Sequence, residues 1–328
     1  MRDLVQSFPD QLRQALSIGT ASTLKPSNRA IQNVLICGLG GSGIGGYLFS
    51  SIVRGSVKAP VSLNQTYDIP AWVGEHTLVI CCSYSGNTEE TLSALEKIQE
   101  TEAEVAVISS GGKLLSIAKD NGYNFIEIPG GKPPRSALSF SLVQLFVLSD
   151  HYGLTQGFVE QFQNVPALLE NEQKDLLSLL DDKLIESLVS KVVVMYSDDT
   201  YHPVIKRAKQ QINENSKALA YCSVAPEMTH NEIVGWTEKH DTVAVIAIHD
   251  KESNYRTNHR LDYIKRIVTP LADSYYVVEP KGANLVEKFY YLIHLFDWVS
   301  VLIAEKKGID PVEVDVITAL KEELKAIQ

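Results

Sequence analysis

The sequence predicts an α/β protein with two doubly wound, parallel-sheet domains (flavodoxin-like sandwiches) joined by a helical connector. Three observations carry this prediction. Short apolar runs rich in β-branched residues alternate with helical patterns in both halves of the chain, and such runs suit strands buried on both faces of a parallel sheet. The length of 328 residues leaves room for about two domains. Between the halves, residues 153–190 have a helical pattern without a strand.

The first predicted domain covers residues 1–152. Strands are expected at the apolar runs bounded by Gly, Ser or Asn, namely 33–37, 61–64, 77–82 and 104–109. Helical patterns occupy 43–54, 88–99 and 113–120, and a longer helix at about 136–150 closes the domain. Leu138, Leu142, Leu145 and Phe146 form the apolar seam of this last helix.

The connector and the second predicted domain complete the chain. Residues 153–190 are rich in Leu, Glu and Asp and lack the Gly, Ser or Pro bias of a flexible linker. In the second domain, 191–328, strands are expected at 191–196, 218–222, 242–248 and 274–278, and helices at 202–215, 258–268, 283–305 and 312–326. Strand–helix alternation implies right-handed crossovers in both domains. The second domain could be a diverged copy of the first.

Composition and charge exclude several classes of protein. Hydrophobic residues make up 45% and charged residues 21%, which excludes wholesale disorder. The net charge of −10 and the lack of a basic stretch argue against nucleic acid and anionic membranes as partners. No apolar run approaches the ~18 residues of a spanning helix. The amphipathic start and four cysteines without zinc spacing predict a cytoplasmic protein with reduced thiols.

A glycine-rich loop, Gly38-Leu39-Gly40-Gly41-Ser42-Gly43, follows the first expected strand and opens a helix. Glycines admit a close ligand, and the helix start offers free amides and partial positive charge, so the loop suits an anion. It also fits the G-x-G-x-x-G dinucleotide pattern, but that pattern requires an acid about 20 residues on, where Asn64-Gln65-Thr66 stands. A tight turn without a ligand is the third interpretation.

A second loop, Ser83-Tyr84-Ser85-Gly86-Asn87-Thr88, lies between another expected strand and helix. Three hydroxyls and a glycine at the end of a strand suit phosphate oxygens. The alternative is a plain helix cap by Thr88, which accounts for one hydroxyl and not for three. Because ligands of open parallel sheets bind beyond the strand ends, the two loops are expected to grip one phosphate. Neither loop has the G-K-[ST] of a nucleotide hydrolase.

These two loops resemble those of sugar isomerase (SIS) domains, which bind phosphosugars. The resemblance to bifunctional phosphoglucose/phosphomannose isomerases runs from about residue 30 to the C-terminus. It rests on Pro134-Arg135-Ser136, Asn213-Glu214-Asn215, Pro226-Glu227-Met228-Thr229-His230-Asn231-Glu232 and Val316-Ile317-Thr318-Ala319-Leu320-Lys321. It implies an aldose–ketose isomerase of carbohydrate metabolism (glycolysis and gluconeogenesis). Such an enzyme interconverts glucose 6-phosphate, and mannose 6-phosphate too, with fructose 6-phosphate through a cis-enediol.

The resemblance also implies roles for particular residues. Phosphate would lie on Gly40, Gly41, Ser42, Ser83, Ser85 and Thr88. Glu214 would move the proton between C1 and C2, Arg135 would stabilise the enediolate, and His230 with Lys321 would open the ring. Without the resemblance, Glu214 and Lys321 read as solvated helix residues and His230 as an ordinary loop histidine. Arg135 reads as a surface arginine, although a cation at a helix start is disfavoured.

The resemblance further implies a homodimer whose active site lies between the two domains and across the interface, since His230 would come from the neighbouring subunit. No metal and no cofactor are expected, because Arg135 meets the developing charge and no ligand cluster is present. Two rival functions remain: a non-catalytic sugar-phosphate-binding regulator, and another SIS phosphosugar enzyme such as an etherase. A regulator would usually carry a DNA-binding module and a basic face.

Overall fold

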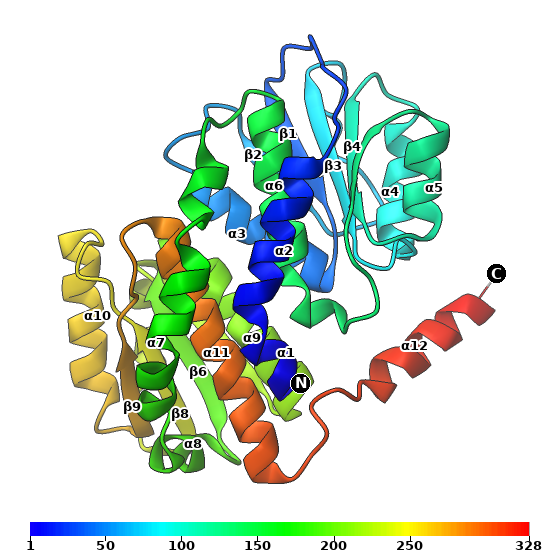
Figure 1. Cartoon of the computed structure of the whole chain (residues 1–328). Helices are drawn as coiled ribbons and strands as arrows, with labels where there is room; N and C mark the ends of the chain where they lie inside the picture. Colours follow the sequence, from blue (N-terminus) through cyan, green and yellow to red (C-terminus); the bar gives the residue numbers. More distant parts are fainter. Residues whose placement is uncertain (328) are drawn as a thin grey trace. The chain divides into compact units, whose positions relative to one another are not determined.

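The computed structural model describes residues 1–327 and contains two compact units. The N-terminal unit comprises residues 6–172 and 281–291. The C-terminal unit comprises residues 1–5, 173–280 and the described residues from 292 on. Each unit is built around one parallel sheet (Figure 1). The domain boundaries inferred from the sequence remain a prediction.

The N-terminal unit holds a five-stranded parallel sheet with the order β2-β1-β3-β4-β5. Its strands are β1 (Asn33–Cys37), β2 (Val61–Asn64), β3 (Thr77–Ser83), β4 (Glu104–Ser109) and β5 (Asn124–Glu127). The chain moves outward from β1 to β2 and then returns to β3 on the other side of β1. The carboxyl ends of β1 and β3 therefore form the topological switch point, where open α/β sheets bind ligands. The doubly wound prediction is confirmed here, although the sequence analysis did not foresee β5.

Helices cover both faces of this sheet. They are α2 (Phe8–Ala21), α3 (Gly40–Val53), α4 (Glu89–Ile98), α5 (Gly112–Asp120) and α6 (Leu138–His151), with the short 3-10 helices η1 (Pro134–Ser136) and η2 (Phe158–Phe162). Alternate side chains of the central strands, such as Leu35, Val79 and Val107, form one core cluster with α4 and α5. This is the period of two expected for a strand. On α3, Gly46 lies against the side chains of Ile36 and Leu63, while α6 packs on α3 and α2 packs on α6 (Figure 1).

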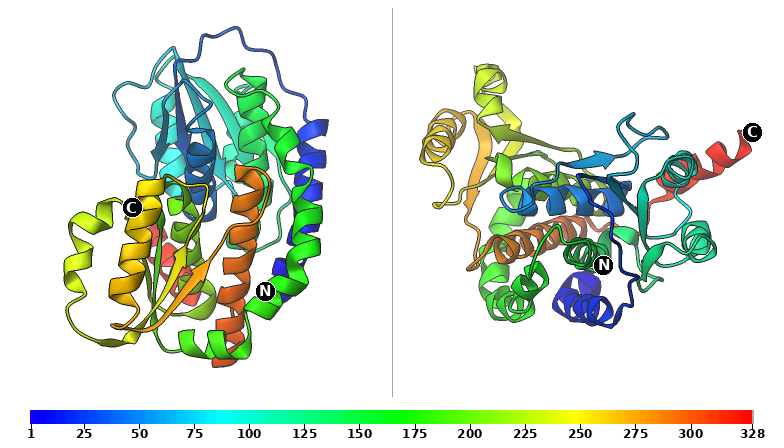
Figure 2. Two further views of the ribbon diagram at one scale, coloured as in Figure 1. Left: turned by 90° about the vertical axis from the view of Figure 1, so that its left-hand side faces the viewer. Right: turned by 90° about the horizontal axis from the view of Figure 1, so that it is seen from above.

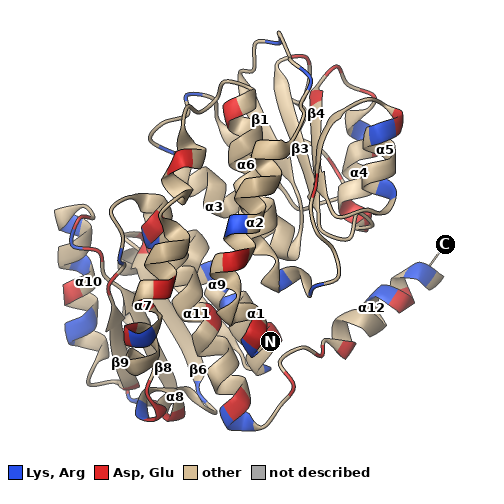
Figure 3. Cartoon of the chain, in the orientation of Figure 1, with Lys and Arg blue, Asp and Glu red and all other residues tan. Residues whose placement is uncertain are grey.

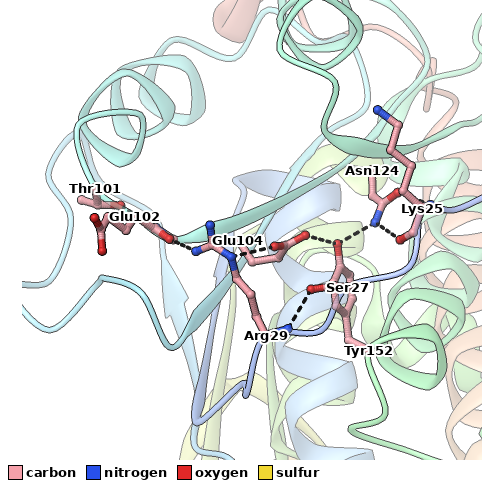
Figure 4. A network of polar contacts seen from close by, with 9 residues as sticks. Lys25, Ser27, Arg29, Thr101, Glu102, Glu104, Asn124 and Tyr152 are labelled. Atoms are coloured by element: carbon pink, nitrogen blue, oxygen red, sulfur yellow. Dashed lines mark hydrogen bonds and ion pairs between the residues drawn. The ribbon is translucent and has the colours of Figure 1, made fainter.

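Residues 22–32 form neither helix nor strand and are held at the amino ends of β4 and β5 (Figure 4). The Asn124 side chain accepts a hydrogen bond from the Lys25 amide at 2.7 Å and donates one to the Lys25 carbonyl at 3.0 Å. It also donates to the Tyr152 hydroxyl, which in turn donates to Glu104 at 3.1 Å. Arg29 completes the network by pairing with Glu104. A side-chain amide thus replaces the strand partner that this backbone segment lacks.

The C-terminal unit holds a four-stranded parallel sheet with the order β7-β6-β8-β9. Its strands are β6 (Val192–Asp198), β7 (Ala220–Ala225), β8 (His240–Ile248) and β9 (Ala272–Val278). The order matches the first four strands of the other sheet, which agrees with two related units. Its helices include α1 (Arg2–Gln6), α8 (Asp182–Leu188), α9 (His202–Ser216), α10 (Tyr255–Val268) and α12 (Asp315–Ala326), with 3-10 turns η3 (Asp199–Tyr201), η4 (Glu227–His230) and η5 (Glu232–Gly235).

Helix α10 closes one face of this second sheet (Figure 2). Leu261 and Ile264 of α10 share a core cluster with Tyr196 and Val245 of the strands. Two long helices, α7 (Val165–Leu179) and α11 (Leu285–Lys307), contain residues of both compact units. As expected from the sequence, residues 153–190 hold the helices η2, α7 and α8 and no strand, and their role as a connector stays a prediction.

Helices α9 and α11 are joined by a buried polar network. Arg207 pairs with Asp297 at 2.8 Å, and Gln211 donates to the same carboxylate at 2.8 Å. One turn further along, Asn215 donates to the Ser300 hydroxyl at 2.9 Å. Burial raises the pKa of Asp297, whereas the Arg207 charge lowers it.

No helix among residues 1–327 has the length and apolar character needed to cross a bilayer.

Candidate functional site

The glycine-rich loop begins directly after β1. Helix α3 starts at Gly40, earlier than the predicted residue 43, with Leu39 extended at its N-cap and Gly40 at a φ of +52°. The Ser42 amide already bonds to the Leu39 carbonyl at 3.0 Å. Gly40 and Gly41 therefore occupy the first two helical positions, whose amides have no intrahelical carbonyl to bond. The earlier start places free amides and the positive end of the helix dipole at the switch point.

The second loop folds back on itself through its hydroxyls. Ser83 is buried, and its Oγ lies 2.8 Å from the Thr88 Oγ1 and accepts the Gly86 amide at 3.1 Å. Thr88 stands at the N-cap of α4 but makes no side-chain cap bond. The plain-cap interpretation is therefore wrong for its side chain, which holds the loop closed instead. Ser85 is exposed and accepts the Asn87 amide at 3.2 Å.

Tyr84 joins the two loops to two further segments, one after β4 and one before η1. Its amide donates to the Ser42 hydroxyl at 3.1 Å, and its carbonyl accepts the Ser110 amide at 3.1 Å. Its own hydroxyl accepts the Lys132 amide at 3.0 Å. The sequence analysis did not single out Tyr84, whose only signal was its place between the two serines of the loop. It fixes the spacing of the segments that would surround an anion.

Arg135 lies in η1, at the edge of the same site. It is 5% exposed, so the surface-arginine interpretation is wrong. A Cβ on Gly41 would lie 3.0 Å from the Pro134 carbonyl oxygen, which shows how closely η1 approaches the start of α3. Within the N-terminal unit, the structure thus brings both loops and the one predicted catalytic cation together. Hydroxyls, helix amides and a guanidinium suit a phosphorylated ligand despite the negative net charge.

The other three predicted catalytic residues belong to the C-terminal unit. Glu214 is half-buried on the last turn of α9, His230 is exposed at the end of η4, and Lys321 is exposed on α12. Glu214 precedes β7 and His230 follows it, so they flank opposite ends of this six-residue strand. Six strand residues span about 20 Å, which is longer than a hexose. One copy of the unit therefore does not bring Glu214 and His230 together.

The second sheet carries no anion loop at its own strand ends. Asp198 at the end of β6 accepts the Tyr201 amide and the Ser253 hydroxyl, and Asp250 after β8 accepts the Tyr201 hydroxyl at 2.5 Å. The burial of Tyr201 and these carboxylates raise the pKa of its hydroxyl. Carboxylates thus stand where the first sheet presents glycine amides.

Comparisons with known proteins agree with this architecture. A family model described as "Bacterial phospho-glucose isomerase C-terminal SIS domain" matches residues 181–324. The C-terminal domain of glucosamine-fructose-6-phosphate aminotransferase from Francisella tularensis superimposes with a TM-score of 0.74 at 15% identity, covering 94% of this chain and 97% of that one. At that identity the likeness concerns the fold alone. The fold and the family model together define an α/β protein of the SIS type.

Two curated relatives narrow the class. A bifunctional phosphoglucose/phosphomannose isomerase from Caldicellulosiruptor bescii is 35% identical over 100% of both chains. Another from Aquifex aeolicus is 35% identical over 90% of this chain and 91% of its own. The chain belongs to the bifunctional phosphoglucose/phosphomannose isomerase family. The resemblance inferred from the motifs is confirmed, and with it the isomerase class of enzyme.

Proposed function

We propose that this enzyme interconverts glucose 6-phosphate and fructose 6-phosphate, and accepts mannose 6-phosphate as the C2 epimer. The observation that carries the proposal is the cluster in the N-terminal unit: two strand-end loops with Ser42 and Ser85, joined through Tyr84 and bordered by the buried Arg135. Such a cluster binds a phosphate through amides and hydroxyls and leaves one fixed cation for charge elsewhere on the sugar. The names of the curated relatives support this substrate class.

The proposed chemistry moves one proton between C1 and C2 through a cis-enediol. The Glu214 carboxylate takes the proton from one carbon and returns it to the other, while the carbonyl oxygen gains negative charge. Arg135 stabilises that charge, and a cation held in place before the reaction does so without reorganisation. His230 and Lys321 transfer the protons that open the pyranose or furanose ring, since only the open chain has an acidic C–H beside a carbonyl.

We further propose that the enzyme acts as a homodimer in which His230 serves the partner's substrate. Within one copy, Glu214 and His230 are separated by the length of β7. This supports the proposal, because one sugar phosphate is too short to contact both residues. Beside η4 lies a hollow of about 910 Å³, lined by η5 and α10. Val234 and Tyr255 on its wall are 72% and 73% exposed, which favours coverage by another protein surface. A second copy fits because Thr229, the residue before His230, lines the hollow.

A single substitution tests the central role. Glu214→Gln keeps the shape of the side chain but removes the base, so we expect turnover to fall by about 10²–10⁴-fold. Binding of a hexitol 6-phosphate, which has the phosphate but no carbonyl, should stay close to the wild-type value by calorimetry. A coupled assay on fructose 6-phosphate and mannose 6-phosphate measures turnover.

The matched control is Glu96→Gln, which removes an exposed carboxylate on α4 and should leave turnover unchanged. Unaltered turnover in Glu214→Gln would remove Glu214 from the role of base. Binding without any isomerisation by the wild-type chain would favour the regulator, and cleavage of an ether-linked sugar phosphate would favour the etherase.

A further inference from the structure

Lys217 lies directly after α9 in an unusual backbone conformation. Its φ of +47° and ψ of +47° are left-handed, a region that favours glycine or asparagine at the end of a helix. For a residue with a Cβ, this conformation costs roughly 1 kcal/mol. The contacts of its side chain offset this cost.

The ammonium group of Lys217 contacts three carbonyl oxygens at once. It donates to Glu214 at 2.9 Å, to Asp310 at 2.8 Å and to Glu313 at 2.7 Å. We call these three hydrogen bonds the Lys217 bridge. Glu214 is the proposed base, whereas Asp310 and Glu313 lie in the loop between α11 and α12. An ammonium has three donors, so the bridge uses its full capacity.

The loop that receives the bridge sets the direction of α12. Gly308, at a φ of +65°, ends α11, and the Asp310 side chain accepts the Val312 amide at 2.7 Å. Beyond the loop, α12 has no buried residue, so its own packing does not fix its position within the unit. Figure 3 shows this helix standing apart from the body of the unit, with positions of both charges coloured along its ribbon. Its place therefore depends on the loop.

A second lysine strengthens the same junction. Lys307, at the end of α11, donates to the carbonyls of Ser216 at 2.7 Å and Lys217 at 3.2 Å. The end of α9 is also held from within by the Asn215–Ser300 contact. These contacts fix the carboxyl end of α9 on α11. The Lys217 bridge then connects this end of α9 to the loop before α12.

We propose that Lys217 is a positioning residue of the isomerase: its bridge holds the helix that carries Lys321 in a fixed place relative to Glu214. The inference rests on the roles proposed above for Glu214 and Lys321. Neither the ammonium nor the backbone of Lys217 takes part in proton transfer. It acts by limiting the movement of α12, so that the Lys321 amine is presented to the sugar in one orientation.

A double-mutant cycle tests the inference. Lys217→Met keeps the length of the side chain and removes the ammonium, and we expect kcat/KM to fall by about 10–100-fold. In a Lys321→Ala background the same change should lower kcat/KM by no more than about twofold, since the residue being positioned is already gone. Equal factors in the two backgrounds would show general damage to the protein and overturn the inference.

Two further variants separate the bridge from the backbone. Lys217→Gly relieves the left-handed conformation, so the unfolding temperature should hold or rise while kcat/KM falls as in Lys217→Met. Lys325→Met removes a lysine from the exposed surface of α12 and should leave activity unchanged. Activity restored by glycine would mean that the backbone conformation matters and the ammonium does not, which would also overturn the inference.

Hydrogen exchange distinguishes this inference from the proposed function. In Lys217→Met, the amides of residues 309–318 should exchange faster than in the wild type, with those of β6 and β8 unchanged. Unchanged exchange at 309–318 would overturn the bridge whatever the kinetics. If Lys321→Ala is fully active, the proposed role of Lys321 fails, and faster exchange would still establish that Lys217 holds α12.

Discussion

His294 on α11 is a histidine with no exposed surface and a neutral ring. Its Nε2 accepts the Trp298 indole N–H at 3.1 Å. Burial lowers the pKa of His294 from an ordinary 6.5 to about 4. Because the charged ring would lose its hydration inside the unit, the folded protein binds this proton less readily than the unfolded chain.

This difference predicts how stability changes with pH. The unfolded chain binds the extra proton between pH 6.5 and 4, so the free energy of unfolding should fall as the pH drops through that window. The full effect is about 3 kcal/mol, and the stabilisation is complete above pH 6.5. Urea unfolding followed by tryptophan fluorescence measures it. His294→Gln keeps an acceptor for Trp298 and should flatten the profile; an equally steep profile would assign the slope to other groups.

Some residues of the candidate site were predictable from the sequence and others were not. Ser42 and Ser85 were predicted at the site because strand–turn–helix order fixes where such loops come together, whereas Arg135 was placed there only by the family resemblance. Lys217 and Tyr84 were not, since their contacts reach residues distant in sequence, at Glu313 and Lys132. Neither the alternation of strands and helices nor a short motif predicts contacts between residues so far apart in the sequence. The same limit hid the burial of Arg135, which depends on how η1 approaches Gly41.

At the scale of elements, the segment 22–32 depends on a few polar contacts rather than on packing. Asn124 satisfies both backbone groups of Lys25 and lies at the amino end of β5 (Figure 4). The candidate site lies beyond the opposite, carboxyl ends of β1 and β3. Changes in this network should therefore affect stability and leave catalysis intact.

Asn124→Leu provides the test at this scale. It removes the partner of the Lys25 amide and one of the two contacts of the Lys25 carbonyl, which keeps the His151 ring at 2.9 Å, so we expect a loss of about 1–3 kcal/mol in the free energy of unfolding. The KM and kcat should match the wild type. Asn121→Ala, which changes an exposed side chain at the end of α5, should cost less. A raised KM in Asn124→Leu would show that this end of the sheet communicates with the site.

Most elements were predictable because buried parallel strands are apolar throughout and helices alternate with them. β5 was missed because Asn124-Phe125-Ile126-Glu127 is short and polar at both ends, as befits an edge strand. The start of α3 was misplaced by three residues because glycine, unfavourable inside helices, occupies its first turn.

At the scale of the whole molecule, mixing two inactive chains tests the shared site. Neither Glu214→Gln nor His230→Asn should turn over substrate at an appreciable rate alone. If His230 serves the partner, a mixed dimer has one site with both wild-type groups, so unfolding and refolding the chains together should restore about a quarter of wild-type activity. Activity is followed by the coupled assay and dimers by light scattering. If mixed dimers form and no activity returns, His230 and Glu214 of the same chain would act on the same substrate, and the shared site would be wrong.

The two sheets share their strand order but present opposite chemistry where their strands end. The first offers glycine amides and hydroxyls; the second offers Asp198 and Asp250. An anion approaching the second sheet meets carboxylates, so the repeated architecture does not double the binding capacity. The three catalytic residues proposed for the second unit come from separate elements: Glu214 from the end of α9, His230 from η4 beyond the carboxyl end of β7, and Lys321 from α12. Under the proposed roles, affinity for the phosphate and reactivity toward the sugar fall to different units, so a substitution that alters one contribution leaves the other in place.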